Sequence, residues 1–288
     1  MMKFSIPLVL LVAAATMTQA EELYDLRGPD PVKGQVYVVS AKSTGKDLTR
    51  TIKFMDQTIN DKFDEIIRKK KEVEVLATKG DEITRMRTKI VQDVREEITR
   101  KGKRKDKLKS TERELQGQYV YSERTAKGWK NSLEDVTPSD KQKQDLKDYV
   151  PFKEEDIFYP KEKVKVGHSF TIDPKLFEKV MGHQFENFKA NGSGKFVRVE
   201  KKDDDEIAII EVEFEMTGKS KEDDLLLDVS IKGKGTVERS LKHGFDRRSV
   251  TTSTMSMKGG GENDGQKIEV EFSGTTNTED LVELKLKK

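Results

Sequence analysis

The sequence predicts a mainly β protein made of two similar antiparallel halves, which form half-barrel or sandwich-like sheets and are joined by a short helix-containing connector. Three observations support this prediction. Apolar and polar residues alternate along several segments, two short phrases recur in the same order in both halves, and polar turn segments separate the alternating runs. Alternation of period two is typical of strands with one buried and one solvated face.

An N-terminal stretch of 20 residues, MMKFSIPLVLLVAAATMTQA, predicts a secretory signal peptide. It has a lysine, a short apolar run and a small residue, Ala20, before Glu21, which is the order of a charged region, an apolar region and a cleavage site. The apolar run is too short to span the roughly 30 Å of a bilayer core. The chain has no cysteine, so neither a lipid-anchoring cysteine nor a disulfide is available. We therefore expect an exported protein, periplasmic or secreted, that is not a lipoprotein.

Residues 21–34 are expected to be a flexible segment, because Gly28, Pro29 and Pro31 interrupt any regular pattern. The first β half is predicted over residues 35–136 and opens with the apolar-rich strand GQVYVVSAKS. Apolar spacing between Ile52 and Lys71 fits both a helix and a strand, and periodicity alone leaves that choice open. The first half is longer than the second at residues 100–110, where we expect an extended hairpin loop.

The connector is predicted over residues 137–159. Thr137 or Ser139 is a candidate N-cap for a short polar helix that Pro151 ends. The second β half follows over residues 160–288. It contains a second short helix that opens with Asp173 and Pro174, residues favoured at the N-cap and first helical position.

The clearest strand is IIEVEFEMTG in the second half. Its alternation predicts one apolar face directed to the core and one carboxylate face directed to water. The same alternation recurs around residues 225–231. The apolar face of these two segments is the candidate surface for an apolar ligand, and its residues are Ile210, Val212, Phe214, Val229 and Ile231.

The repeated phrases are ELQGQYVYSERTAKGW at residues 114–129 and SIKGKGTVERSLKHGF at residues 230–245. Each follows a second shared phrase, a strand and polar turn ending in Asp-Glu-Ile. A duplicated β unit would place the two Glu-Arg pairs on equivalent strands, with their charges directed outward because burying unpaired charge costs several kcal/mol. The residues concerned are Glu123, Arg124, Glu238 and Arg239, with Trp129 and Phe245 beyond matching turns.

No stretch identifies a reaction. The three histidines, His168, His183 and His243, lack the close helical spacing of a zinc site, and no cysteine can assist them. Gly218-Lys219-Ser220 lacks the earlier glycine that a phosphate-binding loop requires. The acidic runs at residues 203–206 and 222–224 do not alternate as calcium ligands do. We therefore assign no catalytic residue, no metal site and no cofactor.

The 55 basic and 53 acidic residues nearly balance, which argues against a field that steers nucleic acid. A local basic run has no interleaved aromatic residue to stack on a base. It is either a solvated loop or a weak contact with an anionic envelope surface. The residues of this basic run are Arg100, Lys101, Lys103, Arg104 and Lys105.

The stretches PKEKVKVGHSFTID at residues 160–173 and LQGQYVYSERTAKGW at residues 115–129 resemble uncharacterised exported proteins of planctomycete-type bacteria. That resemblance implies two β halves and carries no catalytic residue. The predicted fold is also loosely similar to the half-barrel of periplasmic lipoprotein carriers, whose curved sheet covers an apolar ligand. That similarity concerns the fold and is weak evidence of function.

Two functional hypotheses follow. The first is a non-enzymatic envelope protein that binds a partner, or an apolar ligand on a concave sheet. The alternative is a hydrolase whose carboxylate and histidine residues come together only in the fold. Convergence of His168, His183 or His243 with a carboxylate would favour the hydrolase.

Overall fold

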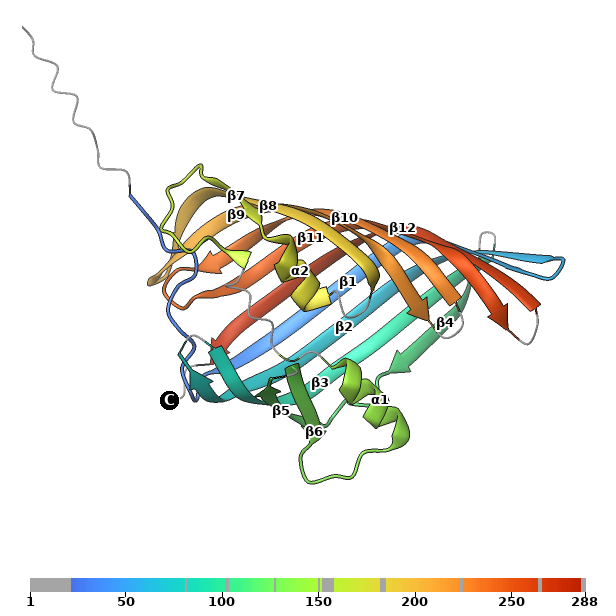
Figure 1. The fold of residues 1–288 in the computed structure, drawn as a ribbon, viewed down its shortest axis with the longest axis horizontal. Coiled ribbons are helices and arrows are strands. Elements are labelled where there is room, and N and C mark those ends of the chain that lie inside the picture. The colour runs from blue at the N-terminus through green and yellow to red at the C-terminus, as the bar shows by residue number, and fades with distance from the viewer. Residues whose placement is uncertain are drawn as a thin grey trace, which may run out of the picture.

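The structure, a computed structural model, describes residues 22–80, 82–101, 104–126, 128–149, 151, 158–181, 185–222, 225–263 and 266–285. They form one antiparallel sheet of 12 strands with two short helices (Figure 1). The prediction of a mainly β, antiparallel protein is confirmed. The elements are β1 Val36–Phe54, β2 Gln57–Lys79, β3 Glu82–Lys101, β4 Arg104–Glu112, β5 Tyr119–Thr125, β6 Gly128–Leu133, α1 Asp140–Asp148, β7 Ser169–Ile172, α2 Pro174–Met181, β8 Glu186–Lys202, β9 Asp205–Glu222, β10 Leu225–Ser240, β11 Phe245–Asn263 and β12 Gln266–Lys285.

The two expected halves share a single sheet, because the first and last strands pair with each other. The sheet order is β6-β5-β3-β2-β1-β12-β11-β10-β9-β8-β7, and β4 pairs with β3 beside β5. The β1–β12 ladder runs from Val36 opposite Lys285 to Phe54 opposite Ile268, with one irregularity after Lys46. The helices α1 and α2 lie in and just after the connector between the halves (Figure 1).

The strands that carry the repeated phrases have corresponding neighbours. In the first half β3 lies between β2 and β5, and β5 between β3 and β6; in the second half β9 lies between β8 and β10, and β10 between β9 and β11. The registers also correspond, since Glu123 lies opposite Arg85 and Glu238 opposite Ile209. Arg85 and Ile209 each follow Asp-Glu-Ile by two positions. β4 is additional to the first half.

The segment from Ile52 to Lys71 is strand, which answers the question that its periodicity left open. β1 ends at Phe54, a two-residue turn at Met55 and Asp56 follows, and β2 begins at Gln57. The prediction of an extended loop at residues 100–110 is wrong. Residues 104–112 form β4, which pairs with β3 from Val94 opposite Glu112 to Lys101 opposite Arg104.

Both helices begin at the predicted residues. Ser139 caps α1: its side chain accepts a hydrogen bond from the backbone N–H of Gln142, and the Gln142 side chain accepts one from the backbone of Ser139. This reciprocal arrangement satisfies two amide groups that the first helical turn leaves unpaired. α2 begins at Pro174, and the Asp173 carboxylate accepts from the Lys175 amide at 3.0 Å.

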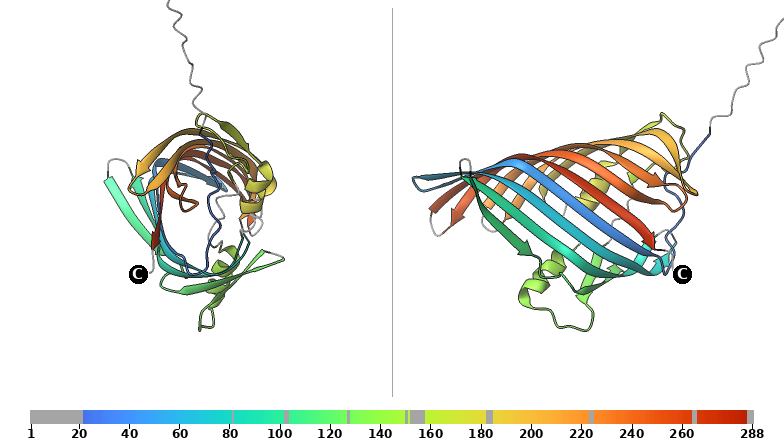
Figure 2. Two further views of the ribbon diagram at one scale, coloured as in Figure 1. Left: turned by 90° about the vertical axis from the view of Figure 1, so that its left-hand side faces the viewer. Right: turned by 180° about the vertical axis from the view of Figure 1, so that it is seen from behind.

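The sheet is strongly curved (Figure 2), and the alternating burial along its strands gives it two chemically different faces. Alternate residues on each strand face the concave side, where the N-terminal segment lies within the curve of the sheet. On β9, Ile210, Val212 and Phe214 belong to this concave face, while Glu211 and Glu213 belong to the exposed convex face. The predicted assignment of carboxylates to the solvated face therefore holds for β9.

Buried apolar side chains form three clusters on the concave face and at its edge. The first lies at the end of the sheet that carries the β8–β9 and β10–β11 turns, which we call the near end. The second lies beside it over β1–β3. The third lies between α1 and the sheet and includes Leu146 of that helix. The first cluster contains Leu26, Tyr159, Val164, Phe196, Ala208, Ile210 and Val237; the second Tyr37, Val73, Val75, Ile83, Met86, Phe245 and Val282; and the third Ile90, Leu115, Val120, Leu133 and Leu146.

Residues 22–31, which we call the N-terminal strap, are packed rather than loose, so the prediction of a flexible segment here is wrong. Leu26 is fully buried in the first cluster. Tyr24 pairs with Val164 through two backbone hydrogen bonds of 2.8 and 2.9 Å. Gly28 has φ +75° and approaches Gly244 so closely that a Cβ at position 28 would overlap its backbone. The strap is thus held against both the segment around Val164 and the β10–β11 turn.

Arg239 holds this arrangement together. Its guanidinium donates to the carbonyls of Leu26, Arg27 and Gly244, with N–O distances of 2.6 Å to Arg27 and 3.0 Å to Gly244. It also pairs with Asp246 at 2.7 Å and lies 4.2 Å from the ring centroid of Tyr159. The prediction that Arg239 points outward is wrong. A fully buried guanidinium is tolerated because a carboxylate and three carbonyls replace its hydration.

Replacement of Arg239 by methionine should destabilise the fold strongly. Removing one partner leaves Asp246 without its charge partner, and carbonyl groups of the strap lose their donor. We expect the free energy of unfolding to fall by about 3–5 kcal/mol in urea titrations. Arg248→Met is the control, because Arg248 pairs with Glu238 and Glu279 while 45% of its side chain is exposed. Such a pair contributes about 1 kcal/mol or less. If both variants lose the same free energy of unfolding, Arg239 does not have the role given to it here.

Candidate functional site

The five residues predicted to form an apolar ligand face lie on the concave side of β9 and β10. Val229 lies opposite Gly218, and Ile231 lies opposite Met216, so their side chains share the face of Phe214. Their accessibility differs. Ile210 is 0% exposed and Val229 is 6% exposed, because the protein's own side chains cover them. Val212, Phe214 and Ile231 are half-buried.

The open part of this face continues onto the neighbouring strand. Ile231 lies opposite Met255 of β11, which is also half-buried. Phe214 lies opposite Gly233, whose missing side chain leaves room for the phenyl ring; a Cβ at position 233 would overlap that ring. We call the half-buried residues of these three strands the apolar wall: Val212, Phe214, Ile231 and Met255.

Beside the apolar wall the concave face becomes rich in hydroxyl groups. These half-buried side chains form cross-strand contacts, including Ser253 with Thr276 at 3.4 Å and Thr278 donating to Ser43 at 3.0 Å. Ser249 donates to Asp280 at 3.2 Å. Hydroxyl groups can both donate and accept. This hydroxyl floor consists of Ser249, Thr251, Ser253, Thr276, Thr278 and Ser43.

The far side of the concave face, on β1–β3, carries charges in pairs. Arg50 pairs with Asp61 at 3.1 Å and with Glu97 at 3.3 Å. Arg95 pairs with Glu65. Opposite charges at this range neutralise each other's field. The concave face therefore changes from apolar on β9–β10, through hydroxyl groups on β11–β12, to paired charges on β2–β3.

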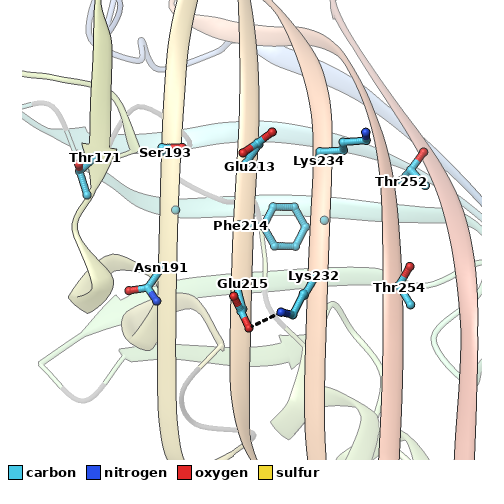
Figure 3. Close-up of a pocket in the computed structure, with 12 residues that line it drawn as sticks. Thr171, Asn191, Ser193, Glu213, Phe214, Glu215, Lys232, Lys234, Thr252 and Thr254 are labelled. Atoms are coloured by element: carbon cyan, nitrogen blue, oxygen red, sulfur yellow. Dashed lines mark ion pairs between the residues drawn. The ribbon is translucent and has the colours of Figure 1, made fainter.

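The convex face has a shallow hollow of about 620 Å³ over five neighbouring strands, with polar side chains along its borders (Figure 3). Glu215 and Lys232 pair across it at 2.9 Å. Sequence reasoning missed this hollow, although Thr252 and Thr254 of β11 and the alternating Glu213 and Glu215 of β9 contribute to it. Its lining residues are Thr171, Asn191, Gly192, Ser193, Glu213, Phe214, Glu215, Lys232, Gly233, Lys234, Thr252 and Thr254.

The described histidines belong to separate turns. His168 follows Gly167 and stacks on Phe170 at 6.5 Å, whereas His243 lies in the β10–β11 turn, 6.2 Å from Phe245. His183 lies outside the described residues. Across the ranges that the structure describes, no three His, Asp or Glu side chains gather as a metal site would require.

The acidic and basic runs also have structural positions. Asp203 and Asp204 form the β8–β9 turn, and buried Asp205 accepts from the Ser240 hydroxyl at 2.6 Å. Asp223 and Asp224 lie outside the described residues. Of the basic run, Arg100 and Lys101 end β3 and Arg104 and Lys105 begin β4, while Lys103 lies outside the described residues.

The pKa of one side chain of the strap, Tyr24, is raised above its ordinary value. A hydrogen bond with the carboxylate of Glu22 raises the pKa of Tyr24 to about 12, because the carboxylate favours the protonated phenol. Tyr24 therefore stays neutral over the physiological range. Its ring meets Phe196 edge-on, with the centroids 5.5 Å apart.

Comparison with known proteins gives no family. No family model matches the chain, and no curated protein matches it. Among solved structures, an outer membrane channel of Pseudomonas putida F1 aligns with 89% of this chain and 98% of its own, at 7% identity and a TM-score of 0.24. That similarity is too low to support an argument. Within the described ranges, neither the length nor the apolarity of any helix suffices to span a membrane.

Gly233→Val tests how the apolar wall is built. The new side chain would occupy the place of the Phe214 ring and force it away from β10. We expect a loss of about 1–3 kcal/mol in the free energy of unfolding, measured in urea. Lys234→Val, which changes the neighbouring residue on the exposed convex face, should cost about 0.5 kcal/mol or less. If Gly233→Val leaves the free energy of unfolding unchanged, the position of the Phe214 ring does not depend on this glycine.

Proposed function

We propose that this chain is an exported binding protein of the bacterial envelope that holds a molecule with an apolar chain on the concave face of its sheet. The apolar wall is the observation that carries the proposal. Its aromatic, aliphatic and thioether side chains remain half-buried, whereas their neighbours Ile210 and Val229 are covered. Burying apolar surface releases about 25 cal/mol per Å², so a ligand that covers the wall gains affinity.

The surroundings of the wall support an amphiphilic ligand in particular. The hydroxyl floor on β11 and β12 lies directly beside Met255 and offers hydrogen bonds to a polar group. Ligand sites commonly combine a mainly apolar lining with a few polar groups that fix orientation. The chain would lie on β9–β10 and the polar end would face β11–β12.

Export is inferred from the first 20 residues, with their lysine, apolar run and Ala20. The hydrolase alternative has less support. His168 and His243 belong to different turns, and each has an aromatic neighbour of its own, Phe170 and Phe245. A binding role requires none of these residues.

Removal of the proposed signal peptide and the compartment of the mature protein can be measured directly. Expressed as the full chain in a Gram-negative host, the protein should appear in the periplasmic or secreted fraction with its N-terminus at Glu21. N-terminal sequencing and intact mass would check both the compartment and the cleavage site. A cytoplasmic protein that keeps residues 1–20 would remove export from the proposal.

Ligand binding is tested with N-phenyl-1-naphthylamine, an apolar dye that fluoresces when it leaves water. Phe214→Ser and Ile231→Ser should each weaken dye binding by about 10- to 150-fold, since each removes roughly 1.5–3 kcal/mol of apolar contact. Glu213→Ser and Lys232→Ser are matched controls, because they change adjacent residues on the convex face. Absence of dye binding by the wild type, or equal losses in the controls, would contradict the proposal.

A further inference from the structure

The apolar wall runs directly into the side chains of the N-terminal strap. Along the concave face of β9, Phe214 and Val212 are half-buried, while the next two residues in the row, Ile210 and Ala208, are 0% exposed. Val212 packs against the first cluster. The row of apolar side chains is thus continuous, and it changes from accessible to covered between positions 212 and 210.

The strap supplies part of the cover at that boundary. Leu26 belongs to the same cluster as Ile210. Tyr24 packs against this cluster, with its ring on the ring of Phe196. The strap is fixed in this position by the Arg239 contacts to the carbonyls of Leu26 and Arg27. An apolar chain that lies along β9 and points to the near end would meet these side chains beyond Val212.

We propose that the strap is the end wall of the ligand site and sets the longest apolar chain that the protein accommodates. This inference rests on the proposed binding function and adds a specificity element, the side chains of Tyr24 and Leu26. The buried guanidinium of Arg239 has four oxygen partners, two of them in the strap, so the end wall is a fixed part of the fold. The ligand class is therefore an amphiphile whose apolar chain has a limited length.

Two variants should move the end wall in opposite directions. The double variant Tyr24→Ala, Leu26→Ala removes side chains from the end wall and keeps the backbone carbonyls that Arg239 binds. Val212→Phe brings the wall forward. Position 212 is the last half-buried position of the row before the covered Ile210, so a larger side chain there fills the space in front of the strap. Leu23→Ala is the control, because Leu23 belongs to the strap and is 57% exposed.

The measurement is competition between the bound dye and saturated fatty acids of increasing length. In the wild type, affinity should rise about fourfold per methylene until the chain reaches the wall and then level off. Val212→Phe should bring the plateau roughly two to three methylenes earlier. The double alanine variant should move it later by about two methylenes, and Leu23→Ala should leave it in place.

The outcomes separate the two proposals. If the wild type binds neither the dye nor any fatty acid, the proposed function fails. If fatty acids bind and the plateau stays at the same length in Val212→Phe and in the double variant, the binding function stands and the strap is not the end wall. A plateau that moves equally in Leu23→Ala would also overturn the inference. Val212→Phe leaves the strap intact, so it decides the question even where the double variant fails to fold.

Discussion

The guanidinium of Arg239 connects parts of the chain that are far apart in sequence. It bonds to the strap at residues 26 and 27, to the β10–β11 turn at Gly244 and to Asp246 of β11, and it stacks on Tyr159 of the connector. Tyr159 in turn donates to Asp246 at 2.9 Å. A charge without these partners would cost several kcal/mol to bury. The near end of the sheet depends on this network, and the apolar wall is a part of the concave surface that the network leaves uncovered.

Period-two alternation gives the sheet its two surfaces, but curvature gives them different functions. A flat sheet with the side chains of β9 and β10 would expose an apolar face broadly. Here the sheet curves (Figure 2), and the strap and Tyr159 cover the apolar side chains of its near end, whereas Val212, Phe214 and Ile231 stay half-buried. Glycines on the concave side help, because Phe214 lies over Gly233 and Phe177 over Gly192.

Much of the fold could be predicted because it depends on local pattern. The alternation at residues 210–216 predicted which side of β9 is buried, and Ser139 and Pro174 predicted where the helices begin. Arg239 could not be placed in this way. An arginine on a strand is usually solvated, and the carbonyls that make its burial possible come from residue 244 and from the strap more than 200 positions away. For the same reason the sequence identified five residues of the candidate face but could not show that the strap and connector cover Ile210.

The pairing of β1 with β12 has a consequence for how the chain reaches this structure. Val36 and Lys285 are direct partners, so the centre of the sheet closes only when strands from opposite ends of the described chain meet. Contacts of such sequence separation slow folding, because a long loop must close before they form. Until then, one edge of β1 presents unpaired amide and carbonyl groups to other chains. The lysines, arginine and threonines along β1 reduce the risk of edge-to-edge aggregation during this interval. A chaperone that shields β1 until β12 is available for pairing would raise the yield of folded protein without changing its final stability.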